Sequence, residues 1–416
     1  MANEKLEQLQ SSILEGNIPQ LVLGMISYAL ESRASDIHIE PLEHTVRIRY
    51  RIDGVLRVIV EYPSNLHPAV VSRIKIMSNL KIDEQRIPQD GRTAVTTKEG
   101  KEMDLRVSTL PSVNGEKIVM RIQDKTRKIP ELDKLGLQGL GLKYLLESLD
   151  CPNGIILNTG PTGSGKTTTL YSCLSKLNTT EVNILTIEDP VEIQMDGLNQ
   201  SQVHPDIDYT FAFGMRTALR QDPDIIMVGE IRDRETVDTA IEASLTGHLV
   251  LSTIHTNSAV ETITRIDNMG VQPFLMASSF ECIIAQRLVR KICDNCKIED
   301  PADPSLLEHI KKVVALIHPA EKIDPKLIEG LKFYKGKGCE KCDNIGYFGR
   351  VGLYEVMKMN NEIRRSILKR DSAMDIENIA IKTGMITLEQ AGIIKALQGE
   401  TTIEEVYSVA RKMEDK

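Results

Sequence analysis

The first part of the chain carries a pattern of apolar and polar positions that predicts both strands and a helix. Every second residue from Val46 to Ile52 is apolar, and the residues between them are arginines, a period of two that is typical of a half-buried β-strand. Asp53-Gly54 then supplies a tight turn into Val55–Val60, which predicts a β-hairpin. Further elements are predicted as a helix at Pro68–Leu80 and strands at Glu102–Ser108 and Glu116–Ile122. We therefore expect a small α/β domain over residues 1–125 and a linker over residues 126–141.

Residues 142–288 alternate between short apolar runs and segments with helical spacing. The apolar runs are Ile155–Thr159, Asn183–Glu188, Asp224–Gly229 and Leu249–Ile254, and the helical segments between them are Lys166–Leu177, Thr210–Arg220, Arg234–Leu245 and Ala259–Asn268. This alternation predicts an α/β domain with a mostly parallel sheet, covered on both faces, that binds ligands at the carboxyl ends of its strands. A cysteine-bearing segment over residues 289–345 and a helical region over residues 346–416 are expected to follow.

Residues 160–167 read Gly-Pro-Thr-Gly-Ser-Gly-Lys-Thr, a complete GxxxxGK(S/T) phosphate-binding loop between an expected strand and an expected helix. Its glycines let backbone N–H groups turn toward the β- and γ-phosphates, Lys166 supplies positive charge, and the Thr167 hydroxyl can ligate Mg²⁺. The loop therefore predicts a site for ATP and Mg²⁺. The expected binding residues are Gly160, Pro161, Thr162, Gly163, Ser164, Gly165, Lys166, Thr167 and Thr168.

Two other apolar runs end in carboxylates. Glu188 and Asp189 end the second run before Pro190, where a hydrolase needs a base or an orienter for the attacking water. An ordinary surface turn is the alternative, because Asp-Pro commonly begins one. Glu230 ends the third run after Gly229, the Walker B arrangement in which an acid holds Mg²⁺ through water or polarises the nucleophile. Strand-end acids are often only solvated, but a phosphate loop upstream favours a functional role for Glu230.

Histidines and arginines complete the candidate catalytic set. His248 and His255 would mark opposite ends of the fourth apolar run, and a histidine at its carboxyl end could sense the γ-phosphate. A structural hydrogen-bonding role is the alternative for each. Four arginines are candidates for stabilising transition-state charge across a subunit boundary, with surface ion pairing as the alternative: Arg106, Arg121, Arg216 and Arg220.

Composition narrows the class of protein. The formal net charge is −8 and tryptophan is absent, so the chain lacks the basic charge and stacking aromatics of a general nucleic-acid binder. No apolar run approaches the roughly 20 residues of a transmembrane helix, and the polar start is not a signal peptide. We therefore expect a cytoplasmic, multi-domain protein.

The cysteines favour a metal site over disulfides, because seven is an odd number in such a chain. Two CxxC pairs, Cys293 with Cys296 and Cys339 with Cys342, make a tetrahedral set that suits one structural Zn²⁺. The helix-like stretch Pro304–Leu331 would be an insertion between the two pairs. A closed site of four cysteines has no open position, so we assign it no catalytic role; four buried or free cysteines are the alternative.

In this order, the motifs resemble those of the secretion ATPases of type II secretion and type IV pilus assembly, over nearly the whole chain. The matching segments are Ala34–Pro41 and Arg86–Arg92 for the N-terminal domain, Gly160–Thr167 for Walker A, Thr186–Glu192 for the aspartate box, Asp224–Glu230 for the atypical Walker B, Thr246–Asn257 for the histidine box and Cys293–Cys342 for the tetracysteine module.

The resemblance implies a RecA-like ATPase domain preceded by a small PAS-like α/β domain, in a hexameric ring with ATP at the seam between the two domains. Glu188 would be a catalytic carboxylate, Glu230 the Walker B acid, and His248 and His255 sensors or couplers of the nucleotide state. The four arginines would surround the nucleotide. Ring motion would act on an inner-membrane platform protein that adds pilin or pseudopilin subunits, and the tetracysteine module favours assembly over retraction.

Family members usually carry a further N-terminal domain that docks on a membrane-associated partner. This chain begins almost directly at the second domain, as an engineered truncation or a short natural variant would. Two other functions stay open: a RecA-like nucleic-acid motor or plasmid-transfer ATPase, and a zinc-stabilised scaffold with a vestigial nucleotide site.

Overall fold

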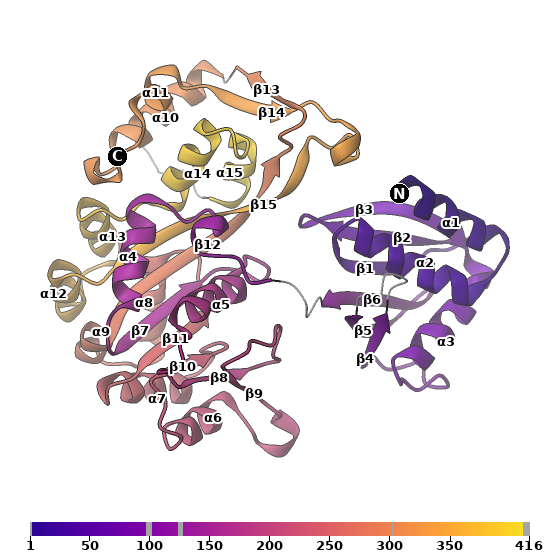
Figure 1. Ribbon diagram of the computed structural model, residues 1–416, viewed down its shortest axis with the longest axis horizontal. Helices are drawn as coiled ribbons and strands as arrows, with labels where there is room; N and C mark the ends of the chain where they lie inside the picture. The colour runs from indigo at the N-terminus through magenta and orange to yellow at the C-terminus, as the bar shows by residue number, and fades with distance from the viewer. Residues whose placement is uncertain (1, 97–101, 124–127, 302, 411–416) are drawn as a thin grey trace. The chain divides into compact units, whose positions relative to one another are not determined.

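The computed structural model describes residues 2–96, 102–123, 128–301 and 303–410. The chain divides into two compact units, residues 1–127 and 128–416, each with its own hydrophobic core (Figure 1). In the described part of the chain, no helix has both the length and the apolar character to cross a membrane.

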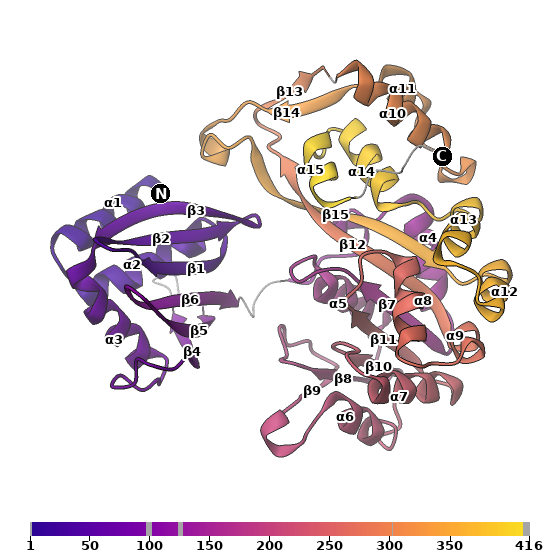
Figure 2. The same ribbon diagram turned by 180° about the vertical axis from the view of Figure 1, so that it is seen from behind.

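The smaller unit is a six-stranded antiparallel sheet with three helices on one face (Figures 1 and 2). In spatial order the strands are β3 (Val55–Pro63), β2 (Thr45–Ile52), β1 (Ala34–Pro41), β6 (Gly115–Gln123), β5 (Glu102–Ser112) and β4 (Gln89–Thr96), and the helices are α1 (Ala2–Leu14), α2 (Ile18–Glu31) and α3 (His67–Met77). Val46, Ile48 and Tyr50 of β2 are fully buried in the core that these helices complete. The intervening arginines therefore lie on the opposite face.

The sequence pattern predicted β2, β3, α3, β5 and β6 but missed the other elements of this unit. β4 is the clearest case: it is an edge strand in which half-buried residues alternate with exposed ones, so it has no apolar face for a periodicity to reveal.

The larger unit is built on a seven-stranded, mostly parallel sheet, as expected. In spatial order its strands are β15 (Tyr347–Lys358), β12 (Phe280–Ile292), β7 (Gly154–Thr159), β11 (Leu249–Ile254), β10 (Ile225–Val228), β8 (Ile184–Glu188) and β9 (Asn199–Gln202). Only the β12–β15 pair within this sheet is antiparallel.

Helices cover both faces of this sheet. One face packs against α6 (Phe211–Ala218), α7 (Arg234–Leu245), α8 (Ala259–Asn268) and α9 (Pro273–Ser279), and the other against α4 (Gly139–Leu149) and α5 (Lys166–Leu177). On β7, Ile155 and Leu157 enter the first core whereas Ile156 enters the second. Burial on both faces explains why these strands read as continuous apolar runs.

The region expected to be helical over residues 346–416 also contains β15, which pairs with β12. Neither strand was predicted, since a buried apolar run does not by periodicity distinguish a strand from a helix segment. α4 also begins at Gly139, inside the predicted linker, of which residues 126 and 127 lie outside the described residues. The remaining strands and α-helices are β13 (Lys297–Asp300), β14 (Phe333–Gly336), α10 (Pro304–Ala315), α11 (Pro325–Gly330), α12 (Asn361–Lys369), α13 (Ala373–Lys382), α14 (Leu388–Leu397) and α15 (Ile403–Val409).

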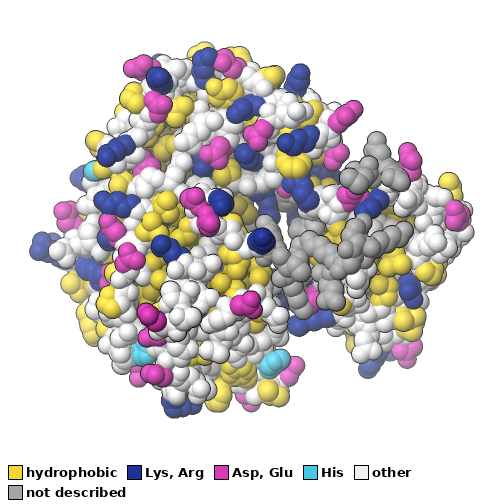
Figure 3. All heavy atoms as spheres, viewed as in Figure 1, with side chains coloured by type: hydrophobic (Ala, Val, Ile, Leu, Met, Phe, Trp, Pro, Cys, Tyr) yellow, Lys and Arg dark blue, Asp and Glu magenta, His cyan; other side chains and the backbone are white. Residues whose placement is uncertain are grey.

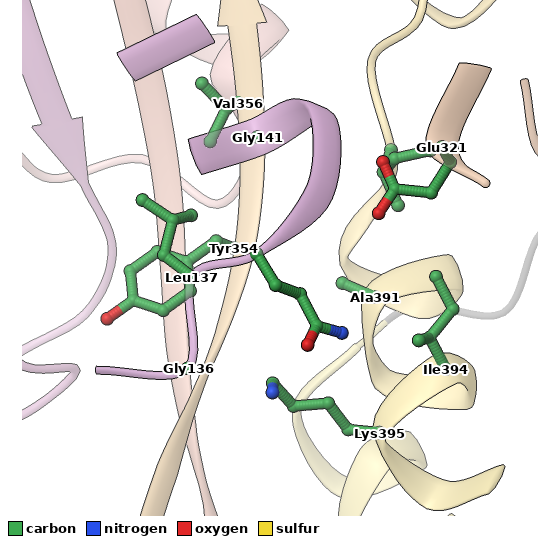
Figure 4. A pocket seen from close by; sticks show the side chains of 11 residues that line it. Gly136, Leu137, Gly141, Glu321, Tyr354, Val356, Ala391, Ile394 and Lys395 are labelled. Carbon is green, nitrogen blue, oxygen red and sulfur yellow. The ribbon is translucent and has the colours of Figure 1, made fainter. Parts of the chain in front are cut away.

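The segment between the two cysteine pairs packs back onto the larger unit. His309 of α10 lies 2.9 Å from Glu389 of α14, and the Glu321 carboxylate accepts the N–H of Leu140 at the start of α4 at 2.8 Å. Glu321 also lines a cavity of about 30 Å³ (Figure 4). A cavity of this size has room for about one water molecule, so it is too small for a nucleotide.

Candidate active site

The phosphate-binding loop connects β7 to α5 at the carboxyl end of the parallel strands. Gly160, Gly163 and Gly165 have φ angles of +150°, +79° and +91°, a region that side-chain-bearing residues rarely adopt. A Cβ on Gly160 would also lie 2.5 Å from the carbonyl oxygen of Gln286, and one on Gly165 would lie 2.8 Å from the side-chain nitrogen of the same residue. All three glycines are therefore required by the turn, and Gly160 and Gly165 also by the close approach of β12.

Lys166 is buried at the first turn of α5. Its ammonium donates to the carbonyl oxygens of Gly160 at 2.7 Å and Pro161 at 3.2 Å, and burial lowers its pKa to about 8. The Ser164 hydroxyl is buried without a hydrogen-bond partner among the described residues, and Thr167 is exposed. An unpartnered hydroxyl beside the N–H groups of a helix N-terminus suits a phosphate group, so the loop fits ATP.

Glu230 follows β10 and lies in a cluster of charged side chains. One carboxylate oxygen accepts from Arg232 at 2.5 Å, and the other lies 3.4 Å from His255 Nε2. Burial opposes the negative charge, but Arg232, His255 and Lys166 together hold the pKa of Glu230 below its ordinary value. Arg232 also reaches Asp189 at 3.7 Å. The structure thus brings together Glu230, His255 and Asp189, three residues that the sequence analysis singled out separately.

Glu188 ends β8 but turns into the protein interior. Its carboxylate accepts hydrogen bonds from the hydroxyls of Tyr171 and Thr186, each at 2.5 Å, and from Gln200 at 3.2 Å. Burial raises its pKa, and these hydrogen bonds oppose the shift. To meet a water molecule at the phosphate loop, this carboxylate would have to leave these partners, whereas Asp189 beside it is exposed.

The two histidines lie at opposite ends of β11, as expected. His255 begins the histidine loop (residues 255–258) at the carboxyl end, next to Glu230. His248 precedes the strand, and its Nδ1 lies 2.9 Å from the carbonyl oxygen of Ala243. Six residues of strand separate the two, roughly 20 Å at 3.3 Å per residue. The structure therefore places His255, but not His248, beside the acidic residues of the site.

Arg216 and Arg220 lie on the surface of the larger unit. Arg216 is on α6 and pairs with Glu235. Arg220 follows the helix and donates from Nη1 to the carbonyl oxygen of Arg216 at 2.8 Å. Both side chains are exposed, so they are accessible to another molecule.

Arg106 and Arg121 are direct cross-strand partners in the smaller unit. Arg106 donates to Gln123 at 3.1 Å and Arg121 to Asp36 at 2.9 Å. They belong to a row of successive cross-strand partners on the sheet face opposite the helices, formed by Arg92, Arg106, Arg121, Asp36 and Arg51. Like charges opposite each other destabilise a sheet, and this row holds four arginines for one carboxylate. Guanidinium groups gathered in this way present several hydrogen-bond donors to an anionic ligand.

The four paired cysteines form one cluster in which all ligand atoms lie within 4.8 Å of one another. The Sγ atoms of Cys293 and Cys339 are 3.8 Å apart, as are those of Cys296 and Cys342, and those of Cys339 and Cys342 are 3.7 Å apart. Zinc–sulfur bonds of about 2.3 Å in a tetrahedron require sulfur separations of about 3.8 Å. The cluster therefore fits Zn²⁺.

Sequence reasoning missed three residues that shape the site. Arg232 holds Glu230, Tyr171 holds Glu188, and Gln286 of β12 accepts from Asn158 and Thr169 at either end of the phosphate loop, at 3.0 and 2.9 Å. Only Arg232 had a local signal, because it lies two residues after Glu230. Gln286 was out of reach because its strand was not predicted.

Comparisons with known proteins agree with the resemblance seen in the motifs. Residues 13–408 match a family model described as "Type II/IV secretion system protein". The chain is 45% identical over 403 residues to the type IV pilus assembly ATPase PilB of Myxococcus xanthus, spanning 97% of this chain and 69% of that protein. It is 46% identical over 410 residues to type II secretion system protein E of Xanthomonas campestris, spanning 98% of this chain and 70% of that protein. Among solved structures, the pilus retraction motor PilT with bound ADP matches at 28% identity and a TM-score of 0.61, covering 93% of this chain and 96% of that chain.

Proposed function

This chain belongs to the type II/IV secretion system protein family, and from that premise we propose that it is a hexameric ATPase that powers assembly of type IV pilus or type II secretion pseudopilus fibres. The observation that carries the proposal is the meeting of the phosphate loop, Glu230 and His255 at one edge of the parallel sheet. The ring would act on an inner-membrane platform protein from the cytoplasmic side, as part of the pilus or secretion machinery.

ATP is held in this proposal by the loop residues 160–168. Lys166 exchanges its two carbonyl partners for phosphate oxygens, and the Ser164 hydroxyl gains an acceptor. The exposed Thr167 hydroxyl would hold Mg²⁺, which would supply positive charge against the phosphates. Glu230 orients the attacking water, and His255 beside it reports whether that position is filled.

Glu188 and His248 can take part in catalysis only under certain structural conditions. Glu188 acts on the water only after its carboxylate leaves Tyr171 and Thr186. His248 couples the nucleotide state only through β11, because it lies at the far end of that strand from the loop.

Arg106, Arg121, Arg216 and Arg220 complete the site across a domain or subunit boundary in the hexamer. The row of arginines on the smaller unit supports this role because several guanidinium groups lie side by side on one sheet face, where they suit an anionic ligand. Arg216 and Arg220 support it because they are exposed and therefore accessible to a neighbouring copy.

Cys293, Cys296, Cys339 and Cys342 would hold Zn²⁺, which would stabilise the fold and take no part in hydrolysis. Assembly is favoured over retraction because the pilus assembly relative is 45% identical to this chain, whereas the retraction motor is 28% identical. On the face of the larger unit drawn in Figure 3, Lys and Arg side chains are interspersed with Asp and Glu rather than gathered into a track. That distribution does not favour a nucleic-acid motor.

ATP turnover by the purified full chain, with and without duplex DNA, tests the proposal. We expect Mg²⁺-dependent hydrolysis that DNA does not stimulate and that a detergent-solubilised platform protein increases. Stimulation by DNA would favour the nucleic-acid motor, and no turnover under any of these conditions would favour the scaffold.

A further inference from the structure

Two buried charged side chains outside every motif form hydrogen bonds to the backbone at the end of the histidine loop and at the start of α8. Arg287 of β12 and Glu355 of β15 are only 7% and 4% exposed. Arg287 Nη2 donates to the carbonyl oxygen of Asn257 at 2.8 Å, and Glu355 Oε1 accepts the N–H of Ala259 at 2.8 Å. The two contacts lie on either side of Ser258, the N-cap of α8.

Each of these side chains has a second contact that leads away from the histidine loop. Arg287 Nη1 donates to the carbonyl oxygen of Gln286 at 3.0 Å, the same oxygen that approaches Gly160 of the phosphate loop so closely that a Cβ there would lie 2.5 Å away. Glu355 Oε2 accepts the N–H of Leu388, the first residue of α14, at 3.3 Å. One pair of residues thus connects the histidine loop to the phosphate loop and to a C-terminal helix.

Burial of this pair is costly, which argues against a purely space-filling role. Burial raises the pKa of Glu355 to about 7, against an opposing effect of Arg287 and of the two backbone N–H groups, and it lowers the pKa of Arg287. Apolar residues of similar size would fill the same volume without a desolvation penalty. What the charges add is directional hydrogen bonding to main-chain atoms, and this fixes the path of residues 257–259.

We propose that Arg287 and Glu355, which we call the clamp, are positioning residues of the nucleotide site. Arg287 ties the histidine loop to the strand that packs against the phosphate loop, and Glu355 holds the start of α8, so that occupancy of the phosphate loop sets the position of His255 beside Glu230. This inference rests on the proposed function, since it assumes that His255 and Glu230 act on the nucleotide. Neither Arg287 nor Glu355 touches the reacting atoms.

The test compares Arg287→Lys and Glu355→Gln with a matched control, Arg290→Lys, in the full chain. Arg290 lies on the same strand and also donates through two nitrogens, at 3.1 and 2.6 Å, but to Glu405 of α15. We expect Arg287→Lys and Glu355→Gln each to lower kcat by between about tenfold and a hundredfold, as displacement of a catalytic group does. KM is expected to change by less than about threefold. Arg290→Lys is expected to keep kcat within about twofold, since it disturbs no group near the loop.

Two further measurements separate positioning from loss of fold. In a double-mutant cycle with His255→Ala, the losses of kcat are expected to be non-multiplicative, because a clamp that acts through His255 has nothing to position once the imidazole is gone. Hydrogen exchange of the Ala259 amide is expected to slow on addition of ADP in the parent and to show no such response in Arg287→Lys.

Each outcome decides the inference. Multiplicative losses in the cycle, kcat unchanged in both clamp variants, or a rise in KM without a fall in kcat would each overturn it. Glu355→Gln and Arg287→Lys change different atoms of the same clamp, so if one variant fails to fold, the kinetics of the other still test the inference. Absence of hydrolysis in the parent would instead overturn the proposed function. If the parent hydrolyses ATP, Lys166→Ala abolishes that activity and both Arg287→Lys and Glu355→Gln keep it, only the positioning role of Arg287 and Glu355 is overturned.

Discussion

The phosphate loop and the cysteine cluster are both candidate ligand sites of the larger unit, but their polar groups are arranged in opposite ways. At the phosphate loop the charged groups already have protein partners: Lys166 donates to two carbonyl oxygens of its own loop, and Glu230 is held by Arg232. In the cluster the four sulfurs are one another's neighbours, at the separations that a tetrahedral metal sets.

This difference is the one expected between a site that binds and releases its ligand in each cycle and a site that keeps its ligand. A ligand that enters the phosphate loop exchanges one set of hydrogen bonds for another, so the net free-energy change is modest and the exchange is reversible. A metal that enters the cluster would bind four sulfurs at once, through bonds stronger than the hydrogen bonds that Cys339 and Cys342 accept from Asn295 and Gly346. Its binding free energy would therefore become folding free energy. We therefore expect changes at the first site to affect activity and changes at the second to affect stability.

The largest expected effect is on hydrolysis. Lys166→Ala and Glu230→Gln should each lower kcat by on the order of 10³-fold or more, because both act on the transition state, while the thermal midpoint stays close to that of the parent. Glu230→Gln should still bind ATP and hold it unhydrolysed. The controls are Lys176→Ala and Glu242→Gln, exposed residues of α5 and α7. Hydrolysis by either test variant within about twofold of the parent would remove this mechanism.

If neighbouring copies share the catalytic site, loss of one arginine is expected to lower ATP turnover by a similar factor. At least one of four alanine variants, at Arg106, Arg121, Arg216 and Arg220, should lose about 10³-fold in turnover while still binding nucleotide. Specific activity should rise with protein concentration as rings form. Arg265→Ala, at an exposed position of α8, is the control. Equal activity per chain in dilute and concentrated protein, together with four active variants, would refute a shared site.

Removal of the metal should lower the stability of the protein, in contrast to the substitutions at the phosphate loop, which should lower activity. Elemental analysis should find about one zinc per chain, as a closed four-cysteine site requires. Chelation or Cys339→Ser should lower the thermal midpoint because metal binding contributes to folding, and Cys151→Ser, outside the cluster, should not. A metal-free protein whose midpoint is unaffected by Cys339→Ser would break the comparison.

The smallest expected effect tests the interior carboxylate next to the nucleotide site. Tyr171→Phe removes a 2.5 Å hydrogen bond to Glu188, which should cost about 1.5–3 kcal/mol of stability and change kcat by less than about tenfold. Burial raises the pKa of Glu188 and the hydroxyl opposes that shift. The variant should therefore lose more stability, relative to the parent, as the pH rises above the ordinary carboxyl pKa of 4.5 and Glu188 ionises.

Unfolding of Tyr171→Phe and the parent by urea, across pH 4 to 8, measures this difference. A constant gap between the two proteins at all pH values would contradict the argument. A loss of kcat as large as that of Glu230→Gln would place Tyr171 in the reaction itself.

Features formed by residues close together in the sequence could be predicted, and features formed by distant residues could not. The phosphate loop and the cysteine pairs were predicted because each is a contiguous run of required residue types. β7, β8, β10 and β11 were predicted because each is a short apolar run ahead of an amphipathic helix. β12 and β15 were missed because a buried strand without such a partner has no distinctive period, and the residues that they carry, Gln286, Arg287 and Glu355, were missed with them.

By itself, the sequence determined the family, the α/β class of the fold and the chemistry that the site contains. Only the tertiary structure decided that Glu188 faces the interior while Glu230 meets His255, and that His248 lies at the far end of β11. It also decided that residues as distant in sequence as Asn158 and Gln286, 128 positions apart, bond beneath the phosphate loop. The physical reason is that a motif consists of residue types at a fixed local spacing, which the sequence contains in full. The partners of a buried polar group depend instead on the order in which the strands lie in the sheet.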